Sequence, residues 1–140
     1  MSQYFNDGDR NSLWNPSSRV AVLFVRTSEV VSSLVGLPSG IGGMWADEYA
    51  IDVDVFVRFV DALVLEYRSS SHQVLRSLLE GWLVTAIVMV ERAGRELPSL
   101  RAEVSLSPRD VSVGSSGVGA LGDGARLLEL AGVQSRAMPV

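Results

Sequence analysis

Apolar side chains recur at helical spacing in the first third of the chain. After a polar stretch, they follow every three or four positions at Val20, Leu23, Phe24, Thr27, Val31 and Leu34. Asn15 and Pro16 are typical of a helix start, and Gly36 with Pro38 soon after is typical of a helix end. The pattern therefore predicts a helix over residues 15–35 with one apolar face.

A second helix is predicted to begin at Asp52, since a carboxylate at that position accepts hydrogen bonds from the free amides of the first turn. The serines at 69–71 should end it. Its core positions are Val55, Phe56, Phe59, Val60, Leu63, Val64 and Tyr67.

A third helix is expected over residues 72–93, capped by the preceding serines and followed by Gly94. Its core series is Leu75, Leu78, Leu79, Trp82, Leu83, Ala86, Ile87 and Val90. Val84 and Val88 make the opposite face apolar as well, which is typical of a helix buried on all sides. We therefore expect either that another part of the chain covers this second face or that a second copy does, in a homodimer.

Short strands are expected near the N-terminus and before the second helix. Residues 4–5 and 13–14 are apolar and flank a turn with Asp7-Gly8, which predicts a hairpin. Residues 48–51 alternate polar with apolar side chains and could pair with that hairpin, whereas residues 37–47 form a glycine-rich loop. The expected fold is mainly α (α+β), with three packed helices and a small antiparallel β element.

The character of the chain changes after Pro98. Residues 103–124 are rich in Ser, Gly and Val, and only residues 125–131 could form a helical turn or two. We expect one globular helical domain over residues 1–98 and a weakly structured C-terminal tail over residues 99–140.

The amino-acid composition of the chain argues against several classes of function. The chain has 140 residues, a net charge of −4 and no cysteine, and its twelve basic residues are all arginine. An acidic chain without a basic cluster argues against a nucleic-acid partner, and the absence of lysine excludes Schiff-base chemistry. The N-terminus has no signal sequence, and the longest apolar run, residues 81–90, is too short to span a membrane. We expect a cytoplasmic protein that does not bind membranes.

Candidate catalytic and metal-binding groups are few. The glycine-rich loop lacks the lysine of a phosphate-binding loop, and the carboxylates near Asp52 and Asp54 lack the spacing of a calcium loop. His72 stands beside Ser70 and Ser71, but helix capping explains these serines better than a catalytic triad does. We therefore expect no catalytic residue, no metal and no cofactor.

Five side chains remain as candidates for binding. Trp14, Trp45 and Trp82 are large anchors, of which Trp82 belongs to a core series and the other two lie in irregular segments. Glu80 is the carboxylate within the most apolar helix, so it needs a partner such as an arginine, and His72 is the only histidine.

Residues 13–17, 36–42 and 74–81 resemble segments of a family of small actinobacterial proteins of unknown function. The resemblance covers roughly residues 1–96 and implies no catalytic residues. The exclusive use of arginine, together with much alanine, valine and glycine, indicates a GC-rich coding sequence.

Two functional classes follow from these features. The first is a non-catalytic protein that binds a protein partner, such as an adaptor, an immunity protein or an accessory subunit. The second is a small-molecule-binding protein or enzyme with an apolar pocket between helices, lined by Phe56, Phe59 and Trp82, with Glu80 or His72 as its polar group. We expect the first class rather than an enzyme.

Overall fold

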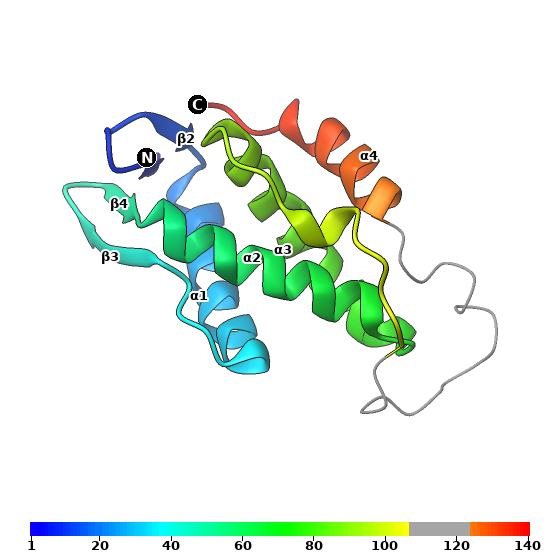
Figure 1. Ribbon diagram of the computed structural model, residues 1–140. Helices are drawn as coiled ribbons and strands as arrows, with labels where there is room; N and C mark the ends of the chain where they lie inside the picture. The colour runs from blue at the N-terminus through cyan, green and yellow to red at the C-terminus, as the bar shows by residue number, and fades with distance from the viewer. Residues whose placement is uncertain (107–123) are drawn as a thin grey trace.

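The computed structural model describes residues 1–106 and 124–140. These residues form an α+β fold with four α-helices, one more than the sequence predicted, and a small four-stranded sheet (Figure 1). In chain order the elements are β1 (Tyr4–Asn6), β2 (Ser12–Trp14), α1 (Ser18–Val35), β3 (Ile41–Trp45), β4 (Glu48–Ile51), α2 (Val53–Ser69), α3 (Gln73–Arg92), the 3₁₀ turn η1 (Pro98–Leu100) and α4 (Gly124–Ser135).

The sheet is mixed, not purely antiparallel, and its strand order is β2-β1-β4-β3. β1 and β4 run parallel, with Phe5 opposite Tyr49, and the two outer pairs are antiparallel. The parallel pair is possible because α1 lies between these strands in the chain and provides the long crossover that parallel strands need. Part of the expected glycine-rich loop is β3, which turns into β4 through Ala46 and Asp47, both at positive φ.

Local rules fixed most helix ends. Asp52 Oδ1 accepts a hydrogen bond from Val55 N at 3.1 Å, as expected of its capping role, and Gly36 ends α1 in the left-handed conformation. The start of α1 was predicted too early. Pro16 O accepts from Gln3 N at 2.9 Å, and Asn15 N donates to Pro139 O at 2.7 Å, so tertiary bonds keep residues 15–17 outside the helix.

The buried face of α1 differs from the predicted one. Ala21, Phe24 and Ser28 are buried, whereas Leu23 and Leu34, which the spacing placed in the core, are exposed. Apolar residues occupy two adjacent sides of α1, and the side that includes Ala21 and Ser28 packs inward. The other side remains at the surface.

The C-terminal segment contributes to the core. α4 packs along α3, with Leu127 and Ala131 fully buried, and Figure 1 shows the two helices side by side. Val84 and Val88 of α3 are also buried within the single chain. Residues 124–138 are therefore not the weakly structured tail that the sequence suggested, because Leu127 and Ala131, four residues apart on one side of α4, pack into the core. The expectation for residues 107–123 lies outside the described residues.

Arg92, at the end of α3, fixes the last residues of the chain. Its guanidinium donates to Ser135 O at 3.1 Å and to Met138 O at 2.8 Å, and also to Leu13 O in β2 at 2.8 Å. One side chain thus satisfies carbonyl groups from both ends of the chain, which brings the C-terminal segment beside β2.

A continuous row of aromatic rings joins the sheet to the helices. Adjacent rings have centroids 4.8–5.5 Å apart, in stacked or edge-on contact, in the order Tyr49, Phe5, Trp14, Phe24, Trp82 and Phe59. All six side chains are buried. The core therefore extends from the sheet through α1 to α3 and α2.

Among the described residues, α3 is the helix that is long and apolar enough to cross a membrane by length and composition. However, 61% of its most apolar window is buried inside the fold. The central helix of a protein core passes the same test, so this finding is weak evidence for a membrane span.

Candidate functional site

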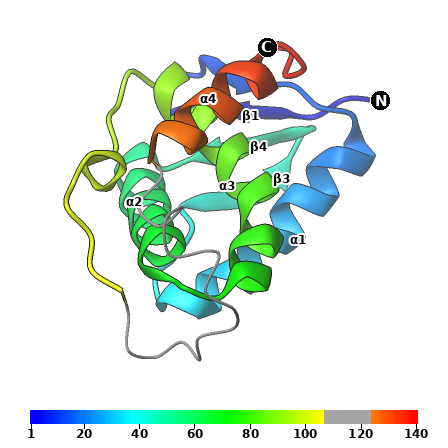
Figure 2. The same ribbon diagram turned by 90° about the vertical axis from the view of Figure 1, so that its right-hand side faces the viewer.

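The structure brings Trp14 and Trp82 together in a groove between α1 and α3. This α1–α3 groove has a volume of about 280 Å³. Trp14, Phe24 and Trp82 form its base, and each is at least nine-tenths buried. Figure 2 shows α1 at the outer edge of the molecule with α3 beside it. The groove lies at the surface, since Leu23 and Leu78 in its lining are exposed.

Two exposed apolar rows border this groove. On α1, Val20, Leu23 and the half-buried Thr27 line the groove, and the exposed Val30 and Leu34 continue the same row beyond it at alternating steps of three and four residues. On α3, Leu78 lines the groove, and the exposed Val74 lies one turn before it. Leu23 and Leu78, which line the groove from the two helices, have exposed fractions of 68% and 78%, which is unusual for neighbouring large apolar side chains.

Trp45 lies elsewhere. It ends β3 at the turn into β4, and 81% of its surface is exposed. The indole therefore does not pin the loop, which was the simpler expectation from the sequence. It does not line the α1–α3 groove.

Glu80 joins three helices through its carboxylate. It accepts two hydrogen bonds from Arg126 of α4, at 3.0 and 3.1 Å, and a third from the phenol of Tyr67 in α2. The guanidinium of Arg76 lies over the Tyr67 ring, 4.6 Å from its centroid. The partner that the sequence required for Glu80 is thus an arginine, but one from the C-terminal helix.

These hydrogen bonds shift the pKa values of the side chains in the cluster. Hydrogen bonding to Arg126 lowers the pKa of Glu80 despite the opposing effect of burial. Burial, and then the bond to Glu80, raises the pKa of Tyr67, and the same carboxylate raises the pKa of Arg126. The carboxylate of Glu80 is paired with Arg126, so the cluster is typical of a structural link between α2, α3 and α4.

His72 acts as the cap of α3. Its Nδ1 accepts a hydrogen bond from Leu75 N at 3.3 Å, and its own backbone amide donates to Ser70 Oγ at 3.0 Å. The serines were expected to cap this helix, but the imidazole does so because Ser70 faces the turn before it. Ser70 is bonded to the backbone of His72 and not to its ring, so the two do not form a nucleophile–base pair.

The inter-helix pocket considered from the sequence is filled by its own side chains. Phe56 and Phe59 are almost completely buried, and Phe59 contacts Trp82 edge-on with ring centroids 5.4 Å apart. Glu80 is engaged by Arg126, and His72 by the helix end. The five candidate side chains therefore do not converge on one site.

The acidic residues near the start of α2 also have local partners. Asp52 caps the helix, and Asp54 accepts a hydrogen bond from Arg95 at 2.6 Å, which lowers the pKa of Asp54. Within residues 1–106 and 124–140, no three histidine or acidic side chains are grouped as a metal site would need.

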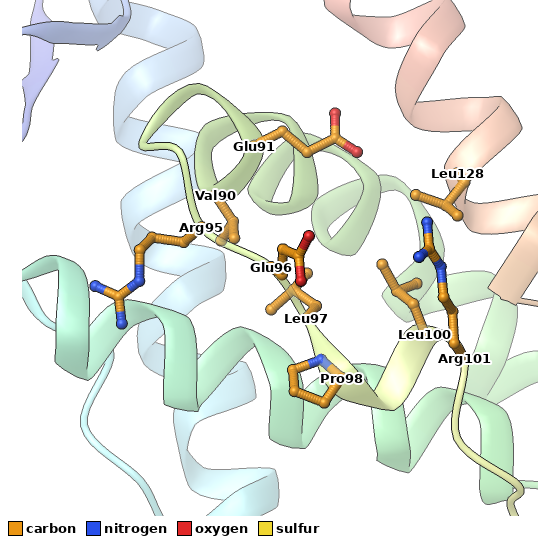
Figure 3. A pocket seen from close by; sticks show the side chains of 9 residues that line it. All are labelled: Val90, Glu91, Arg95, Glu96, Leu97, Pro98, Leu100, Arg101 and Leu128. Atoms are coloured by element: carbon orange, nitrogen blue, oxygen red, sulfur yellow. The ribbon is translucent and has the colours of Figure 1, made fainter.

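A second hollow, which the sequence did not suggest, lies where the end of α3, η1 and α4 meet. This Pro98 cavity has a volume of about 260 Å³, and Figure 3 shows the side chains that line it. Its apolar lining consists of Val90, Leu97, Pro98, Leu100 and Leu128. Glu91, Glu96 and Arg101 add charged groups at its border. The non-local origin of Leu128 explains why the sequence did not predict it.

Glu91 stands out among these charged groups. Although the residue is exposed as a whole, burial of its carboxyl beside the apolar lining raises its pKa. Within the described part of the chain, neither Glu91 nor Glu96 makes a side-chain hydrogen bond or an ion pair. Arg95 also borders the cavity, but its guanidinium turns away towards Asp54 (Figure 3).

Comparison with known proteins places the whole chain in one family. A family model described as "Family of unknown function (DUF6086)" matches residues 1–140. The match includes the C-terminal segment that the resemblance noted from the sequence had left out. Neither a curated protein nor a solved structure matches the chain.

Proposed function

We propose that this chain, which belongs to the family of unknown function DUF6086, is a non-catalytic protein that binds a protein partner through the α1–α3 groove. The observation that carries the proposal is the pair of exposed apolar rows on α1 and α3. Soluble proteins rarely leave large apolar side chains such as Leu23 and Leu78 exposed beside one another without a binding role.

The shape of the surface favours a helix as the occupant. Its two walls are helices, and the apolar residues on α1 alternate at steps of three and four, from Val20 to Leu34. A third helix with apolar residues at the same spacing can place its side chains between these rows. The aromatic base formed by Trp14 and Trp82 would then be covered by the partner's largest side chains.

The charges beside the groove favour an acidic helix. Arg19 and Arg26 are seven residues apart and therefore lie along the same side of α1, one turn before Leu23 and Val30 respectively. Both are exposed. Arg26 already pairs with Glu29 of the same helix at 3.5 Å, whereas Arg19 has no ion pair within the described residues. An acidic residue flanking the apolar face of a partner helix would therefore pair with Arg19.

A second copy of the chain suits this surface less well. The homodimer suggested by the sequence relied on Val84 and Val88, and both are already covered within one chain. We therefore propose a different protein as the partner.

The proposed setting is the cytoplasm of an actinobacterium. A cysteine-free chain suits a reducing compartment, and the exclusive use of arginine for its twelve basic residues suits a GC-rich genome. Neither feature depends on the proposed partner.

The test uses two labelled helical peptides with leucine at three- and four-residue steps, one flanked by glutamate and one by lysine. Fluorescence anisotropy should show tighter, salt-sensitive binding of the glutamate peptide, and Leu23→Ser with Leu78→Ser should abolish it. The matched control, Leu65→Ser with Val133→Ser, removes exposed apolar side chains from α2 and α4 and should bind normally. Equal binding of the glutamate peptide by the groove variant and the control variant would refute the proposed binding surface. Tighter binding of the lysine peptide by the unchanged protein would also refute it.

A further inference from the structure

The Pro98 cavity combines an apolar lining with charges that are not neutralised by one another. Its lining comes from three elements: Val90 from α3, Leu97, Pro98 and Leu100 in and beside η1, and Leu128 from α4. A volume of about 260 Å³ is just below the range typical of pockets for drug-sized ligands, so it suits a compound of a few heavy atoms.

The two carboxylates and the arginine border this cavity from different sides. In Figure 3, Glu91 and Glu96 extend from α3 and the segment after it, and the guanidinium of Arg101 lies on the far side beside Leu128. No ion pair joins Arg101 to either glutamate within the described residues. The apolar lining therefore shares one cavity with two carboxylates and one guanidinium that have no ion pair among the described residues.

The fourth charged residue of the lining, Arg95, already has an ion-pair partner. Arg95 is bonded to Asp54 at 2.6 Å, so it is not available to neutralise Glu91 or Glu96. A carboxylate beside an apolar lining, with no partner, is disfavoured in its charged form, and an ammonium group would relieve that cost.

We propose that the Pro98 cavity binds a small apolar compound with an ammonium group, such as a branched-chain α-amino acid or the N-terminus of a peptide that begins with one. Glu91 and Glu96 bind the ammonium group, and the lining formed by Leu97, Leu100 and Leu128 contacts the branched side chain. Arg101 binds the carboxylate of a free amino acid. This site is separate from the α1–α3 groove and does not depend on the proposed partner.

Three probes separate the contributions: leucine carries both charges, leucinamide only the ammonium, and 4-methylpentanoate only the carboxylate. Backbone amide resonances of residues 96, 97 and 99–101 should shift saturably with leucine and leucinamide, and not with 4-methylpentanoate. Tighter binding of leucine identifies the free amino acid as the ligand, whereas equal or tighter binding of leucinamide identifies a peptide N-terminus. Saturable binding of 4-methylpentanoate as strong as that of leucine, or no saturable shift with any probe, would overturn the proposal.

Variants of the full chain assign the roles. Glu91→Gln with Glu96→Gln should weaken binding of leucine and leucinamide at least tenfold, and Glu129→Gln, an exposed carboxylate of α4 outside the lining, should leave it unchanged. Arg101→Gln should weaken leucine binding to the level of leucinamide and leave leucinamide binding unaltered. Unchanged affinity in the double glutamine variant, with an unchanged amide spectrum elsewhere, would contradict the proposal.

Discussion

The indole Nε1 of Trp82 donates a hydrogen bond to Ser28 Oγ at 3.0 Å, and this bond joins α3 to α1 inside the core. Both residues are buried, and Ser28 in turn donates to Phe24 O at 2.8 Å. The serine is therefore the acceptor that allows an indole to lie in this apolar environment.

Replacing that serine should destabilise the fold. Ser28→Ala leaves the buried indole N–H without an acceptor, and we expect a loss of about 1–3 kcal/mol in the free energy of unfolding. Urea denaturation followed by tryptophan fluorescence measures it. Ser33→Ala, at an exposed position of the same helix, is the control and should change stability by less than about 0.5 kcal/mol. Equal effects of the two substitutions would show that the bond contributes little.

The docking of α4 predicts a large effect at a single leucine. Leu127 is fully buried, so Leu127→Ala should cost about 2–5 kcal/mol of stability through lost burial and a residual cavity. Val133→Ala, on the exposed side of the same helix, should have only a small effect. Thermal unfolding followed by circular dichroism compares them, and a melt of Leu127→Ala that matches the parent would mean that α4 is not part of the cooperative unit.

The link between Glu80 and Arg126 predicts acid sensitivity. The pKa of Glu80 is lowered in the folded protein, so its stabilising effect is complete above the unfolded value near 4.5 and is lost as pH falls through the folded value. Glu80→Gln should therefore reduce stability at pH 7, with a difference from the parent that shrinks below about pH 4.5. Chemical denaturation at several pH values measures this, and a pH-independent difference would be inconsistent with the link.

Glu91 should show the opposite behaviour. Burial raises its pKa in the folded protein, so its charged form opposes folding above the folded pKa, and this effect disappears below the unfolded value near 4.5. Glu91→Gln should leave stability equal or slightly higher at pH 7 and unchanged at pH 4. The same denaturation series tests it. A loss of stability at pH 7 would indicate that Glu91 has a stabilising partner.

Gly40 supplies a backbone conformation that other residues adopt with difficulty. Its φ is +76°, and a Cβ there would lie 2.8 Å from both Asp52 O and Phe56 N. Gly40→Ala should cost at least about 1 kcal/mol, through both strain and this clash. Gly43→Ala, in the adjoining strand β3, where a Cβ meets nothing within 4 Å, is the control. Comparable melting temperatures for the two variants would contradict this role of Gly40.

The two candidate sites depend on how the helices pack together more than on the spacing of residues along the sequence. Trp14 and Trp82 were singled out from the sequence as anchors, but the sequence offered no reason to place them at the base of one groove. Leu23 and Leu78, which now define its walls, had been assigned to the core because their spacing is the same as that of buried positions. The Pro98 cavity needs Leu128, about thirty residues further along the chain, and no local pattern predicts such a meeting.

The sequence by itself determined the features that depend on neighbouring residues. The cap at Asp52, the left-handed end at Gly36 and the turn before β2 follow from hydrogen bonds and backbone preferences within a few positions. Only the tertiary structure decided which side of α1 is buried, that β1 pairs in parallel with β4, and that α4 packs along α3. The physical reason is that the hydrophobic effect is non-directional: it depends on how much apolar surface is buried and not on which side of a helix supplies it. Periodicity shows that a helix has apolar sides, and only the segments that pack against them settle which side is covered.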